Sequence, residues 1–268
     1  MAEGVSWRGR GAAATFAGVT GTYDANYPVT NLADLINVSQ VCRVAPAASA
    51  VAFTFIMPAA VSVQFMALVR HTLLAGSTFR LRLWSDNNPD PVGNPGAIVH
   101  DSTATAVWPT GAPVSGWPSI RPYIMSSAVT ARSGRIDLAS VSGAIEIGGV
   151  DIGEFWSWDQ SPGKALGFQP RAPKIEQAGG SFDLPDQWVP RLQDGQIDML
   201  ALATAATTGI DFQKWAGKKN PFVYVQDSTD ATSWPRTCVL MTNREIPSSV
   251  GIKTRYDQFP FRFIEHWR

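Results

Sequence analysis

Histidine and cysteine, which serve as nucleophiles, acid–base groups and metal ligands, are few and widely spaced in this chain of 268 residues. Three histidines occur, and no two of them have the i, i+4 spacing of a helical zinc site: His71, His100 and His266. No Gly-x-Ser-x-Gly sequence is present, and neither Cys42 nor Cys238 lies in a known nucleophile motif. The sequence therefore predicts no catalytic, cofactor-binding or metal-binding residue, no cofactor, and no enzymatic activity.

One loop partly matches a calcium-binding site. Asp86, Asn88 and Asp90 have the spacing of the first three ligands of a calcium loop. Pro91 stands where such a loop needs a glycine, and Ala97 stands where it needs a bidentate glutamate. Because Asp, Asn and Pro favour Asx turns without any metal, we predict a turn-rich loop, with a weak calcium site as the alternative.

Glycoside cleavage needs two carboxylates that only folding brings together, so the sequence cannot pair them. The pool of candidates is Glu146, Asp151, Glu154, Asp183 and Asp186, most of which suit solvated strand ends. Three tryptophans near this pool have rings that suit stacking on sugars: Trp156, Trp158 and Trp188. Large aromatic side chains mostly serve packing, so we interpret these three as core or interface residues.

The composition limits the classes of partner. Charged residues make up 16% of the chain, and 22 basic residues balance 22 acidic ones. A net charge of zero gives no broad field that would attract nucleic acid or an anionic membrane, and it removes one guard against self-association. Cys42 and Cys238 define no disulfide framework, and two buried free thiols are favoured over one long-range bridge. Residues 1–11 lack the apolar core of a signal peptide.

An uncharged stretch between Arg43 and Arg70 is long enough to suggest a membrane span. Its apolar residues alternate, however, in two runs over residues 51–57 and 61–69 that are separated by Pro58. Alternation with period two indicates strands, so we predict two strands joined by a turn and no membrane insertion.

Short strands and loops continue along the chain and predict a mainly β fold. Further strands are expected over residues 79–83, 135–138, 144–152, 197–203, 221–225, 236–242 and 258–267. The first half suits a jelly-roll or β-sandwich domain of residues 1–155. A smaller β-rich assembly domain is expected over residues 156–268, beginning with an arm or linker at 156–180.

One helix is predicted in the second half, over about residues 208–217. Thr208 suits the N-cap position, and Asp211 follows three positions later as in a capping box. Phe212 and Trp215 share a face at i, i+3 spacing, and Gly217 suits the helix end.

Several segments together resemble known proteins. The segments are Tyr27–Leu32 with Val41–Val44, Leu68–Leu73 with Thr78–Asp86, Ala144–Gly153, Lys219–Val225 and Phe261–Glu265. The first two groups resemble discoidin-like (galactose-binding-like) jelly rolls, although Thr72 stands where those proteins usually have Asn. The remaining segments are similar to uncharacterised tail proteins of tailed bacteriophages, although Gly149 stands where those have Arg.

This resemblance implies a non-enzymatic structural protein of the virion, in the tail or tail tip, assembled in the host cytoplasm. Its partners would be copies of itself and neighbouring tail proteins. The alternative is a carbohydrate-binding module that recognises glycans of the host surface, because the fold alone does not fix the function. The resemblance carries over no catalytic residue, and a glycan-degrading enzyme is the third hypothesis.

Overall fold

The structure of the chain, a computed structural model, describes residues 2–9, 11–109, 119–159, 165–168, 175–176, 182–183, 191–201, 208–217, 219–245, 250–253 and 256–266. Contacts divide the chain into two compact units. The first contains residues 1–158 and 222–240, and the second contains residues 159–221 and 241–267. Residues 222–240 fall within the second domain predicted from the sequence, but in the structure this segment packs with the first unit. The other predicted domain limits stay predictions.

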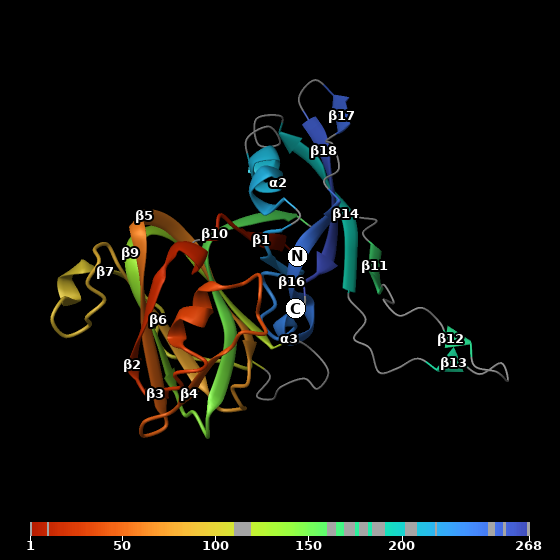
Figure 1. Ribbon diagram of the computed structural model, residues 1–268. Helices are drawn as coiled ribbons and strands as arrows, with labels where there is room; N and C mark the ends of the chain where they lie inside the picture. The colour runs from red at the N-terminus through yellow and green to blue at the C-terminus, as the bar shows by residue number, and fades with distance from the viewer. Residues whose placement is uncertain are drawn as a thin grey trace. The chain divides into compact units, whose positions relative to one another are not determined.

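The fold is mainly β, and the first unit is a jelly-roll-like sandwich of two antiparallel sheets (Figure 1). Its two longest strands, β5 (Ala50–His71) and β9 (Ile120–Ala139), pair with each other and contribute to both sheets. One sheet has the order β2 (Thr15–Thr20), β5, β9, β6 (Thr78–Trp84), followed by β7 (Ile98–Asp101) and β8 (Thr105–Ala106). The other has the order β3 (Thr22–Tyr23), β4 (Cys42–Ala45), β10 (Ile145–Asp159), β5, β9.

Strand β5 is continuous, so the predicted reversal of the chain at Pro58 is wrong. The pairing of β5 with β9 continues on both sides of the proline, with a shift in register between Ile56 and Val61. Pro58 lies exposed within this irregularity, where no ladder partner requires a backbone N–H group. The two strands bend together at this point, and this bend lets one pair of strands serve both sheets.

The alternation in the first half of β5 is confirmed, because its apolar residues point into the core between the two sheets: Val51, Phe53, Phe55 and Met57. After the bend, Met66 and Leu68 point into the same core. Phe65, Ala67 and Val69 point to the opposite face and pack in a second core. Both faces of this half are therefore buried, which explains why the sequence is apolar throughout. No helix among the described residues is long and apolar enough to cross a membrane.

A late segment of the chain completes the second core. Strand β15 (Phe222–Val225) contributes Val223 and Val225 to it. Strand β1 (Ala2–Trp7) lies between β15 and β10, with Gly4 opposite Val225. The short helix α3 (Trp234–Thr237) follows, and β16 (Cys238–Glu245) begins in this unit. In the described part of the first unit, connections contain the 3-10 helices η1 (Gly11–Ala13), η2 (Val29–Ala33) and η3 (Pro95–Ala97).

The second unit is a smaller β structure with one helix in its described part. Strand β18 (Tyr256–Glu265) pairs with β14 (Arg191–Ala201), with residues 241–245 of β16 and with β17 (Val250–Lys253). Strand β11 (Ala165–Phe168) pairs with β14, and β12 (Ile175–Glu176) pairs with β13 (Phe182–Asp183).

Helix α2 (Ile210–Ala216) confirms the predicted helix, but its cap differs from the prediction. The residue before it is Gly209, and no side chain caps the first turn, so Thr208 is not the N-cap. Phe212 and Trp215 do share a face, with ring centroids 6.1 Å apart. The helix ends at Gly217, whose φ of +49° is one that a residue with a side chain rarely adopts.

The first residues of the predicted arm lie in a strand of the first unit. Strand β10 continues to Asp159, and both Trp156 and Trp158 are buried in the first unit with ring centroids 5.2 Å apart. The remainder of the predicted arm, up to residue 180, lies mostly outside the described residues and stays a prediction.

Candidate functional site

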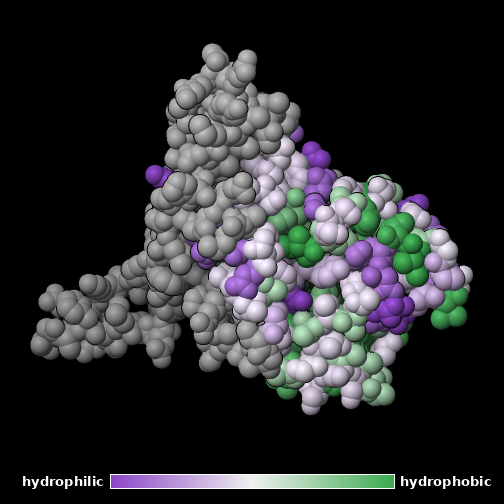
Figure 2. Space-filling model, turned by 180° about the vertical axis from the view of Figure 1, so that it is seen from behind, coloured by the Kyte–Doolittle hydropathy of each residue, from purple (hydrophilic) through white to green (hydrophobic). Residues whose placement is uncertain are grey.

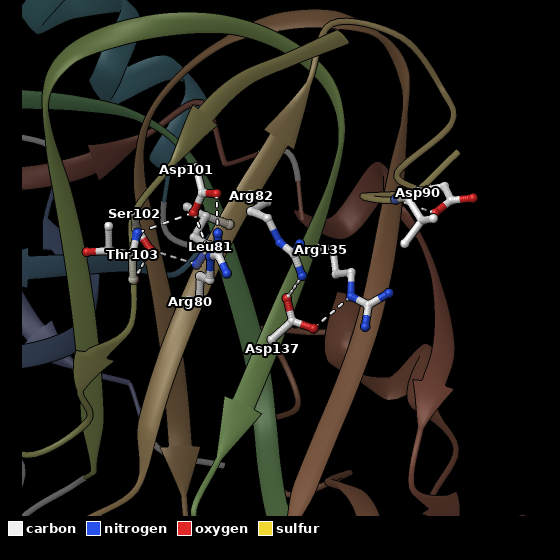
Figure 3. Close-up of polar contacts among 10 residues, drawn as sticks. Arg80, Leu81, Arg82, Asp90, Asp101, Ser102, Thr103, Arg135 and Asp137 are labelled. Carbon is white, nitrogen blue, oxygen red and sulfur yellow. Dashed lines mark hydrogen bonds and ion pairs between the residues drawn. The ribbon is translucent and has the colours of Figure 1, made fainter. Parts of the chain in front are cut away.

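The candidate site lies on the outer face of the sheet that contains β6. Leu81 and Leu83 of β6 are fully buried in the core, so the alternating Arg80 and Arg82 point away from it. The neighbouring strands add acidic and basic residues to the same face. Together, five side chains form what we call the arginine–aspartate strip: Arg80, Arg82, Asp101, Arg135 and Asp137 (Figure 3).

One half of the strip is a two-bond ion pair between β6 and β7. Arg80 donates from Nε to Asp101 Oδ1 over 2.7 Å and from Nη2 to Asp101 Oδ2 over 2.5 Å. The backbone N–H group of Thr103 also donates to Asp101 Oδ1, over 3.3 Å. The Arg80 and Asp101 side chains are 42% and 32% exposed, so a ligand in solvent can reach both.

The other half of the strip places one carboxylate between two guanidinium groups. Arg82 of β6 lies directly opposite Arg135 of β9, an arrangement in which two positive charges repel. Asp137 accepts hydrogen bonds from both arginines, from Nη2 of Arg82 and from Nε of Arg135, the latter over 2.7 Å (Figure 3). The shared carboxylate thus fixes the orientation of both arginines.

The charges of the exposed half hold each other in the ionised state. The hydrogen bond from Arg80 lowers the pKa of Asp101 below its ordinary value of 3.8. The same hydrogen bond raises the pKa of Arg80 above its ordinary value. The Arg80–Asp101 pair therefore keeps both charges from weakly acidic to strongly alkaline pH.

The β6–β7 loop borders the strip and confirms the predicted Asx turns. The backbone N–H of Asn88 donates to Asp86 Oδ1 over 3.1 Å, and that of Val92 donates to Asp90 Oδ1 over 2.9 Å. Asn94 Nδ2 lies 2.9 and 2.8 Å from the two carboxylate oxygens of Asp86 and 3.0 Å from the carbonyl oxygen of Asn88. The amide nitrogen of Asn94 thus lies beside these oxygens, which would be calcium ligands if the loop bound calcium. Within the described part of the chain, no three His, Cys, Asp or Glu residues group in a way that would hold a metal.

Asn94 should therefore be the residue that holds this loop. We expect Asn94→Ala to lower the free energy of unfolding by about 1–2 kcal/mol, because hydrogen bonds to a charged partner are lost. Chemical denaturation would measure the change. Asn87→Ala is the matched control, since Asn87 lies exposed in the same loop. Equal stability of the Asn94 and Asn87 variants would contradict this role.

Packing and hydrogen bonding account for two of the three histidines. His71 is 3% exposed and packs against the ring of Trp108, and within the described residues neither of its ring nitrogens has a hydrogen-bond partner. Burial, with a further contribution from Arg121, lowers the pKa of His71 to about 3, so this ring stays neutral. His100 Nε2 lies 3.1 Å from the hydroxyl group of Tyr123.

The carboxylates considered for glycoside cleavage have separate structural partners. Glu146 accepts from Nε and Nη2 of Arg43 over 3.0 and 2.6 Å. Glu154 accepts from Nε1 of Trp7 over 2.7 Å. Asp151 is buried in the first unit. The side chain of Asp183, and both Asp186 and Trp188, lie outside the described residues.

Packing accounts for the described tryptophans and cysteines that the sequence singled out. Trp158 Nε1 donates to Glu3 Oε2 over 3.3 Å, and Trp156 and Trp158 are only 9% and 8% exposed, so neither presents a ring for a sugar. Cys42 and Cys238 are buried and unbridged.

Sequence reasoning missed the strip, although a signal was present. Charged residues alternate with core residues at Arg80 and Arg82, and again at Arg135 and Asp137. This alternation predicts that each pair faces outward. The pairing of β6 with β9, which brings the two pairs together, depends on contacts between residues more than 50 positions apart.

Comparisons with known proteins concern the fold. No protein-family model matches the chain, and no curated protein matches it. Among solved structures, a family 32 carbohydrate-binding module of C. perfringens NanJ in complex with galactose is 8% identical, covering 58% of this chain and all of that one with a TM-score of 0.38. The lectin domain of lectinolysin complexed with Lewis b antigen is 11% identical, covering 53% of this chain and 94% of that one with a TM-score of 0.36.

A third similar structure is a Ruminococcus gnavus GH29 fucosidase in complex with fucose. It is 10% identical, with a TM-score of 0.39, and the match covers 56% of this chain and 27% of the fucosidase chain. The structure itself shows a mainly β protein whose first unit is a jelly-roll-like sandwich.

Proposed function

We propose that this chain is a non-catalytic binding protein whose jelly roll recognises carbohydrate through the arginine–aspartate strip. The observation that carries the proposal is the Arg80–Asp101 pair, which presents a fixed donor beside a fixed acceptor on an exposed face. Each sugar hydroxyl both donates and accepts hydrogen bonds, so neighbouring hydroxyls fit a guanidinium and a carboxylate held side by side. Because the two side chains already hold each other in place, binding costs little side-chain entropy.

The described surface of the first unit mixes polar and apolar residues. Figure 2 shows that hydrophilic and hydrophobic residues are interspersed on the face of the first unit in that view. Hydrogen bonds from charged groups therefore supply the specificity in this proposal, with apolar contact at the margins, for example at Val99, which is 37% exposed.

A matched ion pair elsewhere in the same unit allows a direct test. Arg43 and Glu146 are 40% and 34% exposed, nearly the same as Arg80 and Asp101. On an array of bacterial-surface and animal glycans, we expect Arg80→Ala and Asp101→Ala to weaken binding at least about tenfold, or 1.4 kcal/mol. Arg43→Ala should bind as the unchanged protein does. Failure of the unchanged protein to bind any glycan, or equal losses in all three variants, would refute the proposal.

Binding at the strip should depend little on pH. The folded-state pKa of Asp101 lies below 3.8, so its negative charge is lost only as the pH falls through that lowered value. We expect the dissociation constant to change by less than about twofold between pH 5 and pH 9, measured by titration calorimetry. A sharp change near pH 6 would instead point to a histidine as the binding group.

A second candidate function is a structural role in a bacteriophage tail, in the virion, after assembly in the host cytoplasm. The observation that favours it is the order of the segments that carry the resemblance. In the first of them, Asn31 Nδ2 donates to the carbonyl oxygen of Val41 over 2.9 Å, and Leu32 is fully buried. In the segment Ala144–Gly153, the Cβ of any residue replacing Gly149 would lie 2.7 Å from Leu35 Cδ2. This close approach accounts for the glycine at a position where the similar tail proteins have arginine.

This second role makes its own prediction. The partners would be other copies of the chain and neighbouring tail proteins, and the chain should be found by mass spectrometry in purified phage particles. Its absence from particles of a phage that encodes it would exclude the role. The two proposed functions are compatible if a tail protein also binds host glycans.

A further inference from the structure

We infer that the arginine–aspartate strip binds an extended, uncharged glycan chain across several sugar units, rather than one terminal sugar. This inference rests on the proposed function and names the class of ligand. It depends on the length of the strip, on the shape of the face that carries it and on its balance of charge.

The strip is longer than one sugar ring. Asp101, Arg80 and Asp137 lie on three consecutive strands, β7, β6 and β9. Neighbouring strands are about 4.8 Å apart, so these three residues extend over about 10 Å. Thr54 of β5, directly opposite Arg135, adds one more strand spacing and a hydroxyl group on the same face. One sugar unit would contact the Arg80–Asp101 pair, whose side chains are 42% and 32% exposed. The next would contact the less exposed group of Arg82, Arg135 and Asp137, whose side chains are 13%, 18% and 25% exposed.

The face that carries the strip is open along this direction. At one end, Asp101 is exposed on β7, which lies at the edge of the sheet. Beyond Thr54 at the other end, Ala17 of β2 is also exposed. Trp84, which follows Arg80 and Arg82 in the alternation of β6, is fully buried and donates from Nε1 to the carbonyl oxygen of Asn94. A ligand can therefore enter and leave at both ends, as an internal segment of a chain does.

The charges around the strip balance. Its three arginines face two aspartates, and Asp90 in the bordering loop is close enough to Arg135 for that arginine to help lower the pKa of Asp90. The main cause of that shift is hydrogen bonding from the backbone N–H groups of Val92 and Gly93. Three positive and three negative charges leave no net charge that would favour a sulfated or carboxylated sugar. Arginine donates hydrogen bonds and aspartate accepts them, so both kinds of residue can bind the hydroxyl groups of an uncharged sugar.

Titration calorimetry with oligosaccharides of increasing length would test the inference. The probes are neutral gluco-, galacto- and manno-oligosaccharides of one to six units, with dextran sulfate and polygalacturonate as acidic comparators. We expect the dissociation constant for one neutral series to fall at least about tenfold from one to four units. Arg80→Ala and Arg135→Ala should each reduce this gain, whereas Arg43→Ala should not.

The other outcomes separate this inference from the proposed function. Equal affinity for one unit and for six would overturn the extended-chain inference and leave carbohydrate binding in place. Binding of the acidic polymers alone would overturn the uncharged class. No binding to any probe or to the glycan array would overturn both. If sedimentation shows that Arg80→Ala and Arg135→Ala dissociate an oligomer while glycan affinity is unchanged, the strip is an interface between copies and the inference fails.

Discussion

Replacing Arg121 with alanine should lower the free energy of unfolding by about 3–4 kcal/mol, a large fraction of the stability of an ordinary domain. Arg121 is only 6% exposed, and its guanidinium carbon lies 5.0 Å from the ring centroid of Phe79 and 5.1 Å from that of Trp234. Its Nε and Nη1 donate to the carbonyl oxygens of Ala106 and Pro122 over 3.1 and 2.7 Å. Burial lowers the pKa of Arg121 to about 10, so this buried group still carries its charge at neutral pH.

The expected loss has two sources. Each contact between the cation and a ring contributes about 0.5–2 kcal/mol, and a buried carbonyl group left without its donor costs about 1–3 kcal/mol. The energy recovered by removing a buried charge offsets part of this sum. Trp234 belongs to the segment 222–240, so Arg121 joins this late segment to the jelly roll within the first unit.

Denaturant unfolding monitored by tryptophan fluorescence would measure the effect. Arg121→Lys should be intermediate, because lysine keeps the charge but lacks the planar group that both rings contact. Arg43→Ala is the control for an exposed arginine and should cost less than about 1 kcal/mol. If Arg121→Ala were no more destabilising than Arg43→Ala, Arg121 would not join the segment to the jelly roll.

The contribution of Asp151 to stability should fall as the pH rises from 4 to 7. Asp151 is 1% exposed among apolar side chains, and this burial raises the pKa of its carboxyl group to about 6. Hydrogen bonds from the Ser6 side chain and from the backbone N–H groups of Val223 and Ile152 counteract the rise in pKa only in part. Within the described residues, Asp151 Oδ2 has no partner.

The direction of the effect follows from proton binding. The folded pKa lies above the unfolded value of 3.8, so the folded protein binds more protons between pH 4 and pH 6. The contribution of protonated Asp151 is therefore complete below about pH 4 and is lost as the pH rises through about 6. A difference of about 2 pH units corresponds to about 3 kcal/mol.

Asp151→Asn isolates this contribution because asparagine does not titrate. The amide adds a donor where Oδ2 has no partner, which should cost about 1–3 kcal/mol at every pH. The difference in stability between the variant and the unchanged protein should therefore shift in favour of the variant by about 3 kcal/mol from pH 4 to pH 7.5. Denaturant titrations at several pH values would measure this difference.

Asp90→Asn provides the control. Backbone N–H groups lower the pKa of Asp90, and its carboxylate is exposed, so any change with pH should be small and of opposite sign. A difference between Asp151→Asn and the unchanged protein that stays constant with pH would show that Asp151 does not titrate as its burial requires.

The local pattern of the sequence was sufficient to predict much of the fold. Alternation at Val51, Phe53 and Phe55 predicts a strand with one face in a core, and the structure confirms it. The spacing of Phe212 and Trp215 likewise predicts the helix. These features depend on side chains a few positions apart, and such side chains interact in the same way wherever the element lies.

Other features required knowledge of partners distant in the sequence. Pro58 signals a break in a strand, but only the pairing of β5 with β9 decides that the strand bends instead of reversing. Segment 222–240 reads as part of a second domain, yet its apolar residues complete a core with β5.

The sequence by itself determined the mainly β class, the one described helix of the second unit and the outward direction of Arg80 and Arg82. The tertiary structure decided that Asp101 and Asp137 meet these arginines, because strand register fixes which residues of distant segments stand opposite each other. The position of β10 between β1 and β5 likewise buries Asp151, and this burial raises its pKa. The candidate site therefore depends on contacts between strands, which no local pattern in the sequence encodes.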